Sequence, residues 1–290
     1  MELVKAGEKT YYIKNAVNIG VYKISEDSVF LIDTGNDKDA GKKILKIIDG
    51  MGWKVEGIIS THSHADHIGG NKLVQERCSC PVYALAAERA FTEFPVLEPS
   101  FLYGGYPFSD LKNKFLFASE SKALPVENNL PQGLEYFSLK GHSFDMLGIK
   151  TDDDVYFLAD SLFSELTITK YHLFFIYDVR EYLNTLDFLS TLKGKFFVPS
   201  HCEATEDISC LIELNRNKIN EISEKILSFC SEGITFEDIL KKVFDEYSLA
   251  MNPNQYVLIG STVRSYLSYL YEEKKIEFAF EDNKMYWKQL

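Results

Sequence analysis

The sequence lacks the features that mark membrane-anchored and secreted proteins. No apolar run approaches the roughly 20 residues that a transmembrane helix needs, and the N-terminal stretch Met1-Glu2-Leu3-Val4-Lys5 lacks the apolar core of a signal peptide. Only five cysteines occur in 290 residues, and they are scattered at positions 78, 80, 202, 210 and 230. An odd, scattered set is typical of reduced thiols. We therefore expect a soluble cytoplasmic protein without a membrane anchor.

Basic residues are also scarce, and this bears on the class of partner. The chain has 31 Lys and Arg against 43 Asp and Glu, a net charge of −12 at pH 7. Within residues 206–290, ten basic residues stand against fifteen acidic ones, a net charge of −5. Proteins that bind nucleic acid neutralise phosphates with Lys and Arg, so this composition makes a nucleic-acid partner unlikely and favours a small-molecule substrate.

Histidine is rare as well, but three of the six histidines fall in one short stretch. His62, His64, Asp66 and His67 directly follow the apolar run 55–59, which is typical of a buried strand. Side chains alternate along an extended segment, so His62 and His64 point to the same side. This geometry predicts one ion between His62 and His64 and another against Asp66 and His67. Imidazole and carboxylate ligands suit zinc, and also iron or manganese.

Three more polar residues share one property: each follows an apolar run that we expect to form a strand. They are His142 after the run 134–139, Asp160 after 155–159 and His201 after 196–199. An isolated histidine at a strand end is usually structural. Three such ends together with the dense histidine cluster favour a metal site over a solvated histidine-rich loop.

These pieces together resemble the metallo-β-lactamase superfamily. The matching segments appear in family order, and they are Leu31-Ile32-Asp33-Thr34-Gly35, Thr61-His62-Ser63-His64-Ala65-Asp66-His67, Gly141-His142-Ser143, Leu158-Ala159-Asp160-Ser161 and Pro199-Ser200-His201. The resemblance implies an α/β fold, a four-layer αββα sandwich over residues 1–205, with the site at one edge of the paired sheets.

The resemblance also implies the ligands of two divalent ions, with zinc as the leading choice and iron or manganese as alternatives. The first ion would be held by His62, His64 and His142. The second would be held by Asp66, His67 and His201, and Asp160 would bridge the two. Asp33 is a candidate for orienting the histidine loop, because ligating imidazoles usually donate their other N–H to a fixed acceptor. Its alternative role is that of a turn residue at a strand end.

Some positions depart from particular branches of the family. Phe144-Asp145-Met146 stands where Pro-Gly-His often follows the Gly-His step, which argues against the glyoxalase II branch. Asp160 in place of a cysteine argues against the zinc β-lactamases of antibiotic resistance, and Asp66 beside His67 argues against the flavodiiron branch.

Two regions outside the ligand motifs leave alternatives open. Residues 93–130 form an aromatic insertion that could be a lid over the metals, a homodimer surface or a flap packed on its own domain. His172, beside Tyr171, is the only histidine outside the ligand set. It is either a packing residue or, with Tyr171, a general acid or substrate contact near the metals.

Residues 206–290 are expected to form a separate C-terminal domain. The pattern predicts a helix over 208–229, a second helix after the capping sequence Thr235-Phe236-Glu237-Asp238, a third from Ser261 or Thr262, and a hairpin over 276–287. This outline is winged-helix-like, and a similar appendage occurs in superfamily members that resemble the mammalian β-lactamase-like protein. The acidic charge favours a packing or oligomerisation module over a DNA-binding one.

The function hypotheses follow from this site. Two cations that share a water lower its pKa and hold a hydroxide ready to attack, while Asp66 orients that hydroxide. The leading hypothesis is a dinuclear-metal hydrolase of a small thioester, ester or lactone. The alternatives are a phosphodiesterase or ribonuclease of the same fold, and a non-enzymatic metal-sensing or DNA-binding regulator.

Overall fold

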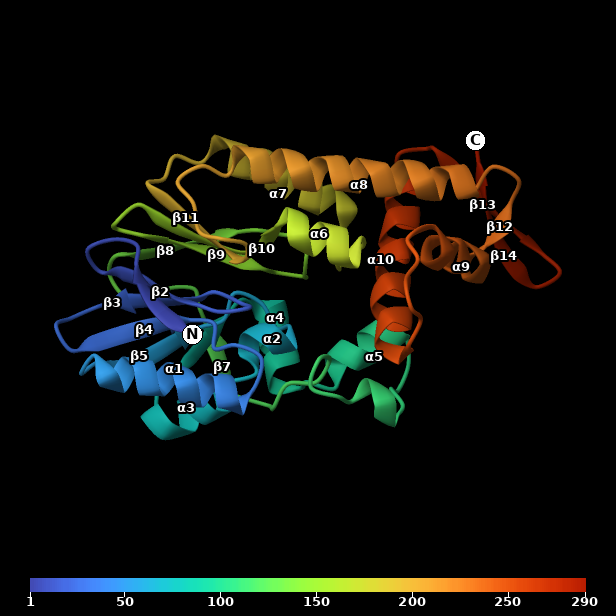
Figure 1. The fold of residues 1–290 in the computed structure, drawn as a ribbon. Helices are drawn as coiled ribbons and strands as arrows, with labels where there is room; N and C mark the ends of the chain where they lie inside the picture. Colours follow the sequence, from blue (N-terminus) through green and yellow to red (C-terminus); the bar gives the residue numbers. More distant parts are fainter.

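The computed structural model describes residues 1–290, and Figure 1 shows two stacked sheets with helices on both outer faces. The first sheet has seven strands in the order β1-β2-β3-β4-β5-β6-β7. Its first four strands pair in antiparallel fashion and the remaining pairs are parallel. The strands are Glu2–Lys5 (β1), Thr10–Lys14 (β2), Ile19–Lys23 (β3), Ser28–Ile32 (β4), Lys54–Ile59 (β5), Val82–Ala84 (β6) and Ala123–Pro125 (β7).

The second sheet has four strands in the order β11-β10-β9-β8. They are Leu134–Ser138 (β8), Leu147–Thr151 (β9), Val155–Phe163 (β10) and Phe196–His201 (β11). Two helices lie between β10 and β11, and a third follows β11. They are Glu165–Tyr171 (α6), Val179–Thr191 (α7) and Ser209–Phe229 (α8). The outer face of the first sheet carries Lys38–Gly50 (α1) and Asn71–Cys78 (α3).

Three hydrophobic clusters hold the four layers together. One packs α1 against the first sheet through residues such as Ile44 and Leu31. A second fills the space between the two sheets and includes Ile59 and Phe157. The third joins the second sheet to α7 and α8, with Leu186 among its members. The αββα sandwich predicted from the sequence is therefore the observed fold.

The parallel pairing of β4 and β5 places the start of the site. Ile32 lies opposite Ile59 at the ends of these strands. Because carboxyl ends of parallel strands meet at one edge of a sheet, Asp33 lies next to the loop that begins at Ser60. Asp33 adopts a left-handed backbone conformation with φ 64°, which turns the chain sharply after β4.

Strand β10 corrects one expectation, since Asp160 lies inside the strand and not after its end. The pairing register with β11 shifts on both sides of Ala159, whose φ is 47°. A bulge of this kind bends a strand and redirects the side chains beside it. The apolar pattern of the sequence predicts a strand end at Ala159, because the bulge there interrupts the regular alternation of side chains.

The aromatic insertion packs on the chain's own C-terminal segment. It follows Ala86–Glu93 (α4) and contains Leu97–Tyr103 (α5) and the 3-10 turn Ser109–Leu111 (η1). Leu102, Leu111 and Leu116 form a small cluster with Val257, and Asn113 donates a hydrogen bond to Asn254 at 2.8 Å. Part of the range 93–130 is not insertion, because β7 completes the first sheet.

The C-terminal segment contains the expected three helices and hairpin. After α8 come Ile234–Thr235 (β12), Phe236–Glu246 (α9), Pro253–Glu272 (α10), Ile276–Glu281 (β13) and Lys284–Gln289 (β14). The prediction that the third helix starts at Ser261 or Thr262 is wrong. The side chain of Asn252 accepts a hydrogen bond from the Gln255 amide, and Pro253 opens the helix. This Asn-Pro start is a strong helix N-terminus that lies upstream of the apolar periodicity.

The large cluster around α7 continues into α10, where Val263 and Leu267 are buried. A continuous core therefore crosses the boundary predicted at residues 205 and 206, and Figure 1 shows α8 running over both regions. No helix combines the length and the apolar character needed to cross a membrane. The thiols of all five cysteines are free.

Candidate metal centre

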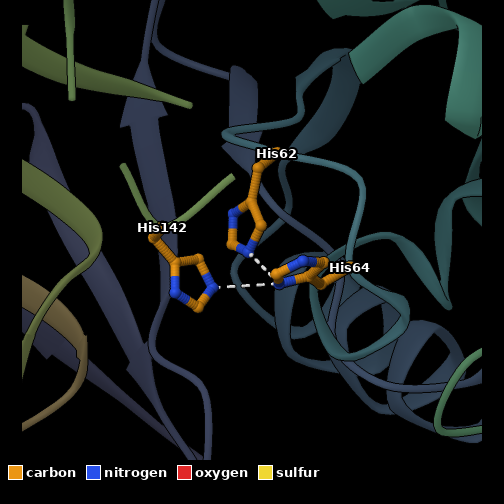
Figure 2. Close-up of side chains that lie close together, drawn as sticks. All are labelled: His62, His64 and His142. Atoms are coloured by element: carbon orange, nitrogen blue, oxygen red, sulfur yellow. Dashed lines mark hydrogen bonds between the residues drawn. The ribbon is translucent and has the colours of Figure 1, made fainter. Parts of the chain in front are cut away.

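Three imidazoles, carried by loops that follow strands of the two sheets, converge on one point (Figure 2). His62 and His64 lie in the loop after β5, and His142 lies in the loop between β8 and β9. The Nδ1 atom of His64 lies 3.1 Å from Nε2 of His62 and 2.9 Å from Nε2 of His142. Ring nitrogens this close suit the coordination of a single ion.

A second group forms beside the first. Asp66 and His67 lie in the short helix Ala65–Ile68 (α2), and His201 ends β11. The Oδ2 atom of Asp66 is 3.4 Å from Nε2 of His201 and 3.9 Å from Nε2 of His67. These three side chains also lie close enough to share one ion.

Asp160 lies between the two groups. Its Oδ1 is 3.0 Å from Nε2 of His67, and its Oδ2 is 3.0 Å from Nε2 of His201 and 3.4 Å from Nε2 of His142. The carboxylate therefore touches one imidazole of the first group and two of the second. All seven side chains that the sequence singles out as ligands are brought together here.

Hydrogen bonds on the far side of three rings set their tautomers. The Nδ1–H of His142 donates to the carbonyl oxygen of Phe175 at 2.9 Å. Nδ1 of His67 lies 2.7 Å from Oδ2 of Asp33, and Nδ1 of His62 lies 3.0 Å from Oγ1 of Thr61. With a proton on Nδ1, Nε2 is the ring nitrogen of each of these three histidines that faces the cluster and can bind an ion there.

Asp33 organises the histidine loop through these contacts. Its Oδ1 accepts the Thr61 amide at 2.8 Å, and its Oδ2 accepts the Thr61 hydroxyl at 2.8 Å as well as the His67 ring. The side chain is buried, with 1% of the residue exposed. Asp33 thus fixes both the backbone and one ring of the loop, in the manner of a carboxylate behind a ligating histidine.

The two groups differ in their affinity for protons. Burial lowers the pKa of His64 to about 4 and that of His142 to about 3. Burial also opposes a proton on His201, but the carboxylates of Asp160 and Asp66 outweigh it and raise that pKa to about 10. The pKa of His67 is raised for the same reason. At neutral pH the first group offers free lone pairs, and the second holds protons.

The donor set fits divalent cations. Nε2 of His67 and Oδ1 of Asp160 lie 3.0 Å apart, but neither forms a hydrogen bond with the other or with any other group. Buried polar atoms in this state are costly unless another group satisfies them. Nδ1 of His64 faces two nitrogens, and one proton can satisfy only one such contact. A cation at each point would satisfy these atoms, and nitrogen and oxygen donors of this kind suit zinc and related metals.

The second group is the open side of the centre. The side chains of Asp66 and His201 are 43% and 22% exposed, whereas His62 and His67 are buried completely. On the other side, Glu98 of α5 lies with its Oε1 3.7 Å from Nε2 of His64. Burial raises the pKa of Glu98 to about 8. The insertion therefore forms one wall of the centre.

Sequence reasoning missed two acidic residues, Glu88 and Glu98. Both lie in or next to the aromatic insertion, at positions that no ligand motif marks. Glu88 is completely buried and accepts hydrogen bonds from the loops that carry His64 and His142. In the sequence, each is simply an acidic residue within a helical segment of mixed polarity. Such residues are common on solvent-exposed helices, so nothing marks these two as buried.

His172 and Tyr171 lie apart from the cluster. The ring of His172 stacks on Tyr247, with centroids 5.1 Å apart. Tyr171 is 47% exposed, and the Lys170 ammonium group lies over its ring. These are packing and surface contacts, and neither side chain contacts the seven candidate ligands.

Comparison with known proteins agrees with this geometry. A family model described as the metallo-β-lactamase superfamily matches residues 13–201, well over half of the chain. The chain belongs to the metallo-β-lactamase superfamily. This span contains all seven side chains of the cluster.

Two kinds of relative are similar in sequence. A hydroxyacylglutathione hydrolase of Nitrobacter hamburgensis is 30% identical over 122 residues, which is 42% of this chain and 39% of that protein. A β-lactamase-like protein 2 homolog of Drosophila melanogaster is 24% identical over 261 residues, covering 86% of this chain and 80% of that protein. The match thus spans about two fifths of the first relative and most of the second. That residues 144–146 set the chain apart from the glyoxalase II branch stays a prediction, because the match to the hydroxyacylglutathione hydrolase covers only 42% of the chain.

Two solved structures share the fold over all or nearly all of the chain, and a third shares it over a smaller part. A β-lactamase domain protein from Burkholderia ambifaria has a TM-score of 0.74 at 14% identity, covering 100% of this chain and 94% of its own. A metallo-β-lactamase family protein from Thermus thermophilus has a TM-score of 0.73 at 17% identity, with 97% and 99% covered. The metallo-β-lactamase DIM-1 covers only 76% of this chain, with a TM-score of 0.55.

Proposed function

We propose that the chain is a dinuclear-metal-dependent hydrolase of a small carbonyl substrate, such as a thioester, an ester or a lactone. The observation that carries this proposal is the position of Asp160, whose two oxygens contact imidazoles of both groups at 3.0 to 3.4 Å. One carboxylate placed in this way can bridge two ions.

Within this proposal, the ligands of the first ion are His62, His64 and His142. Those of the second are Asp66, His67 and His201, with Asp160 shared by both. Zinc is the leading choice of metal, because imidazoles dominate the set. A pair of divalent ions supplies a water of lowered pKa and polarises the substrate carbonyl.

The protein's own groups then set the course of the reaction. Asp66 is the most exposed carboxylate of the cluster, so it can contact both the substrate and the attacking water. We assign to it the orientation of that water and the acceptance of its proton. Asp33, Thr61 and the Phe175 carbonyl hold three rings in place, so the ligand geometry exists before the substrate arrives.

A small substrate is favoured by the charge of the chain and by the relatives. The net charge is −12, and a polyanion bound at the site would need basic side chains that the ligand motifs do not include. Hydroxyacylglutathione hydrolases are among the relatives, and the acylglutathione in their name is a thioester. This supports a thioester as the first substrate to test.

The test is a substrate panel run on protein of known metal content. It compares acyl-thioesters, lactones, phosphodiesters and single-stranded RNA, with Asp66→Ala as the inactive control. We expect metal-dependent hydrolysis of a thioester or lactone that is lost in Asp66→Ala. Metal-dependent cleavage of a phosphodiester or RNA, without carbonyl hydrolysis, would contradict the substrate class and establish the phosphodiesterase alternative.

A further inference from the structure

A buried carboxylate lies between two of the metal-binding loops. Glu88 belongs to α4, and none of its surface is exposed. Burying a carboxylate is costly unless hydrogen bonds replace the lost water. Four hydrogen-bond donors meet this requirement at Glu88, and they come from two separate segments of the chain.

Each carboxylate oxygen serves one segment. Oε2 accepts the backbone amide of Ser63 at 2.8 Å and the Ser63 hydroxyl at 2.6 Å. Oε1 accepts the Ser143 hydroxyl at 2.8 Å and the backbone amide of Asp145 at 2.9 Å. Each oxygen thus receives one backbone N–H and one hydroxyl.

The two segments belong to different sheets and carry the imidazoles of the first group. Ser63 lies between His62 and His64, after β5 of the first sheet. Ser143 directly follows His142, in the loop between β8 and β9 of the second sheet. Glu88 therefore joins the two sheets at the place where their imidazoles must meet.

We propose that Glu88 is a positioning residue that holds these two loops at the separation the first ion requires. This inference rests on the metal assignment of the proposed function. Glu88 does not contact the centre itself, and it acts through Ser63 and Ser143. Carboxylates placed behind metal ligands have effects of about 10- to 100-fold on metal affinity.

The hydrogen-bond pattern makes Glu88→Gln a sharp test. Glutamine has the same shape, but one of its two terminal groups is an NH₂ donor. A hydroxyl can rotate to accept from that NH₂, whereas a backbone N–H cannot. In either orientation the amide therefore directs a donor at the N–H of Ser63 or of Asp145, and one of the two loops loses its anchor.

The matched controls separate position from charge. Glu76→Gln removes the same charge from an exposed residue on α3. Ser63→Ala and Ser143→Ala each remove one hydroxyl donor and keep the Glu88 charge. Thermal unfolding of each metal-free variant shows whether it folds.

The measurement is zinc affinity of the full chain, by competition with a chromophoric chelator, together with the visible absorption spectrum of the cobalt(II)-loaded protein. For Glu88→Gln we expect one binding step to weaken by about 10- to 100-fold, with a changed cobalt spectrum at that step. Both serine variants should weaken the same step, to a smaller extent. Glu76→Gln should match the wild type.

Three results would overturn the proposal. One is a folded Glu88→Gln variant with wild-type affinity and spectrum. Another is a pair of serine variants with wild-type affinity, because each variant removes one of the two donors that hold its loop to Glu88. This result also decides the question if Glu88→Gln does not fold. The third is a wild-type chain that binds no ion, which would defeat the proposed function as well and is thereby distinguishable from the other two.

Discussion

The two halves of the metal centre are built from similar side chains but differ in protonation. His64 and His142 have lowered pKa values, about 4 and about 3, because they are buried among other imidazoles. His201 lies beside two carboxylates, and its pKa is about 10. A cation enters the first half without competition, whereas it must displace protons from the second. One sequence motif thus supplies two chemically different positions, and the variants below change them together or separately.

Asp160→Ala should have the largest effect, because Asp160 is the residue that both halves share. We expect both binding steps to weaken and turnover to fall by more than the ~10²- to 10³-fold that follows removal of a single transition-state donor. Elemental analysis after saturation and gel filtration measures the occupancy, and kcat on the best substrate of the panel measures the activity. An Asp160→Ala variant that retains two tightly bound ions would show that the halves are independent.

Asp66→Ala changes only the open half. We expect the second ion to be lost or weakened, the first to remain, and kcat to fall by about 10²- to 10³-fold, the effect of losing one stabilising group at the reaction centre. The ratio of bound zinc to protein distinguishes the two positions. Equal loss from both steps would contradict the assignment of Asp66 to one half.

Asp33→Asn acts on the orientation of His67 without removing a ligand. Asparagine has one acceptor oxygen and one NH₂ donor in place of the two acceptor oxygens of Asp33. It therefore cannot accept all three hydrogen bonds that come from the Thr61 amide, the Thr61 hydroxyl and the His67 ring. We expect the second-ion affinity to fall by about 10- to 100-fold, as for other partners of ligating histidines, while the first ion is less affected. Isothermal titration of the metal-free variant with zinc measures this difference.

The smallest expected effect is a difference between the two halves in how their metal affinity depends on pH. The raised pKa of His201 means that its proton is still bound between pH 6 and pH 8 in the metal-free protein. Binding of the second ion then releases protons, and its affinity should rise by about tenfold per pH unit for each proton displaced. The pKa values of His64 and His142 lie below this range, so the affinity of the first ion should change little. Titrations in buffers of different ionisation enthalpy count the protons released at each step.

The sequence predicts the layers and the ligand cluster because their signals are local. The stretch from His62 to His67 is dense in ligating side chains, and parallel pairing of β4 with β5 brings Asp33 to it, as the strand-like patterns indicate. His142 and His201 follow apolar runs that can be recognised one at a time. The register of the bulge at Ala159 leaves no such local pattern.

Long-range contacts explain what the sequence does not predict. Glu88 is identified only by donors from Ser63 and Ser143, which are 25 and 55 residues away. The insertion carries no motif that names its partner, and its packing on Val257 depends on the position of α10. The predicted start of α10 is wrong because the Asn252-Pro253 signal precedes the apolar pattern. The division into two domains and the role of the C-terminal segment remain predictions.

The most direct test of the two-ion centre is an equilibrium titration of the metal-free wild-type chain with zinc, followed by elemental analysis of the saturated protein. The arrangement of both groups around Asp160 predicts two ions per chain, bound in two steps of which only one releases protons near neutral pH. Saturation at a single ion per chain, or at none, would contradict it.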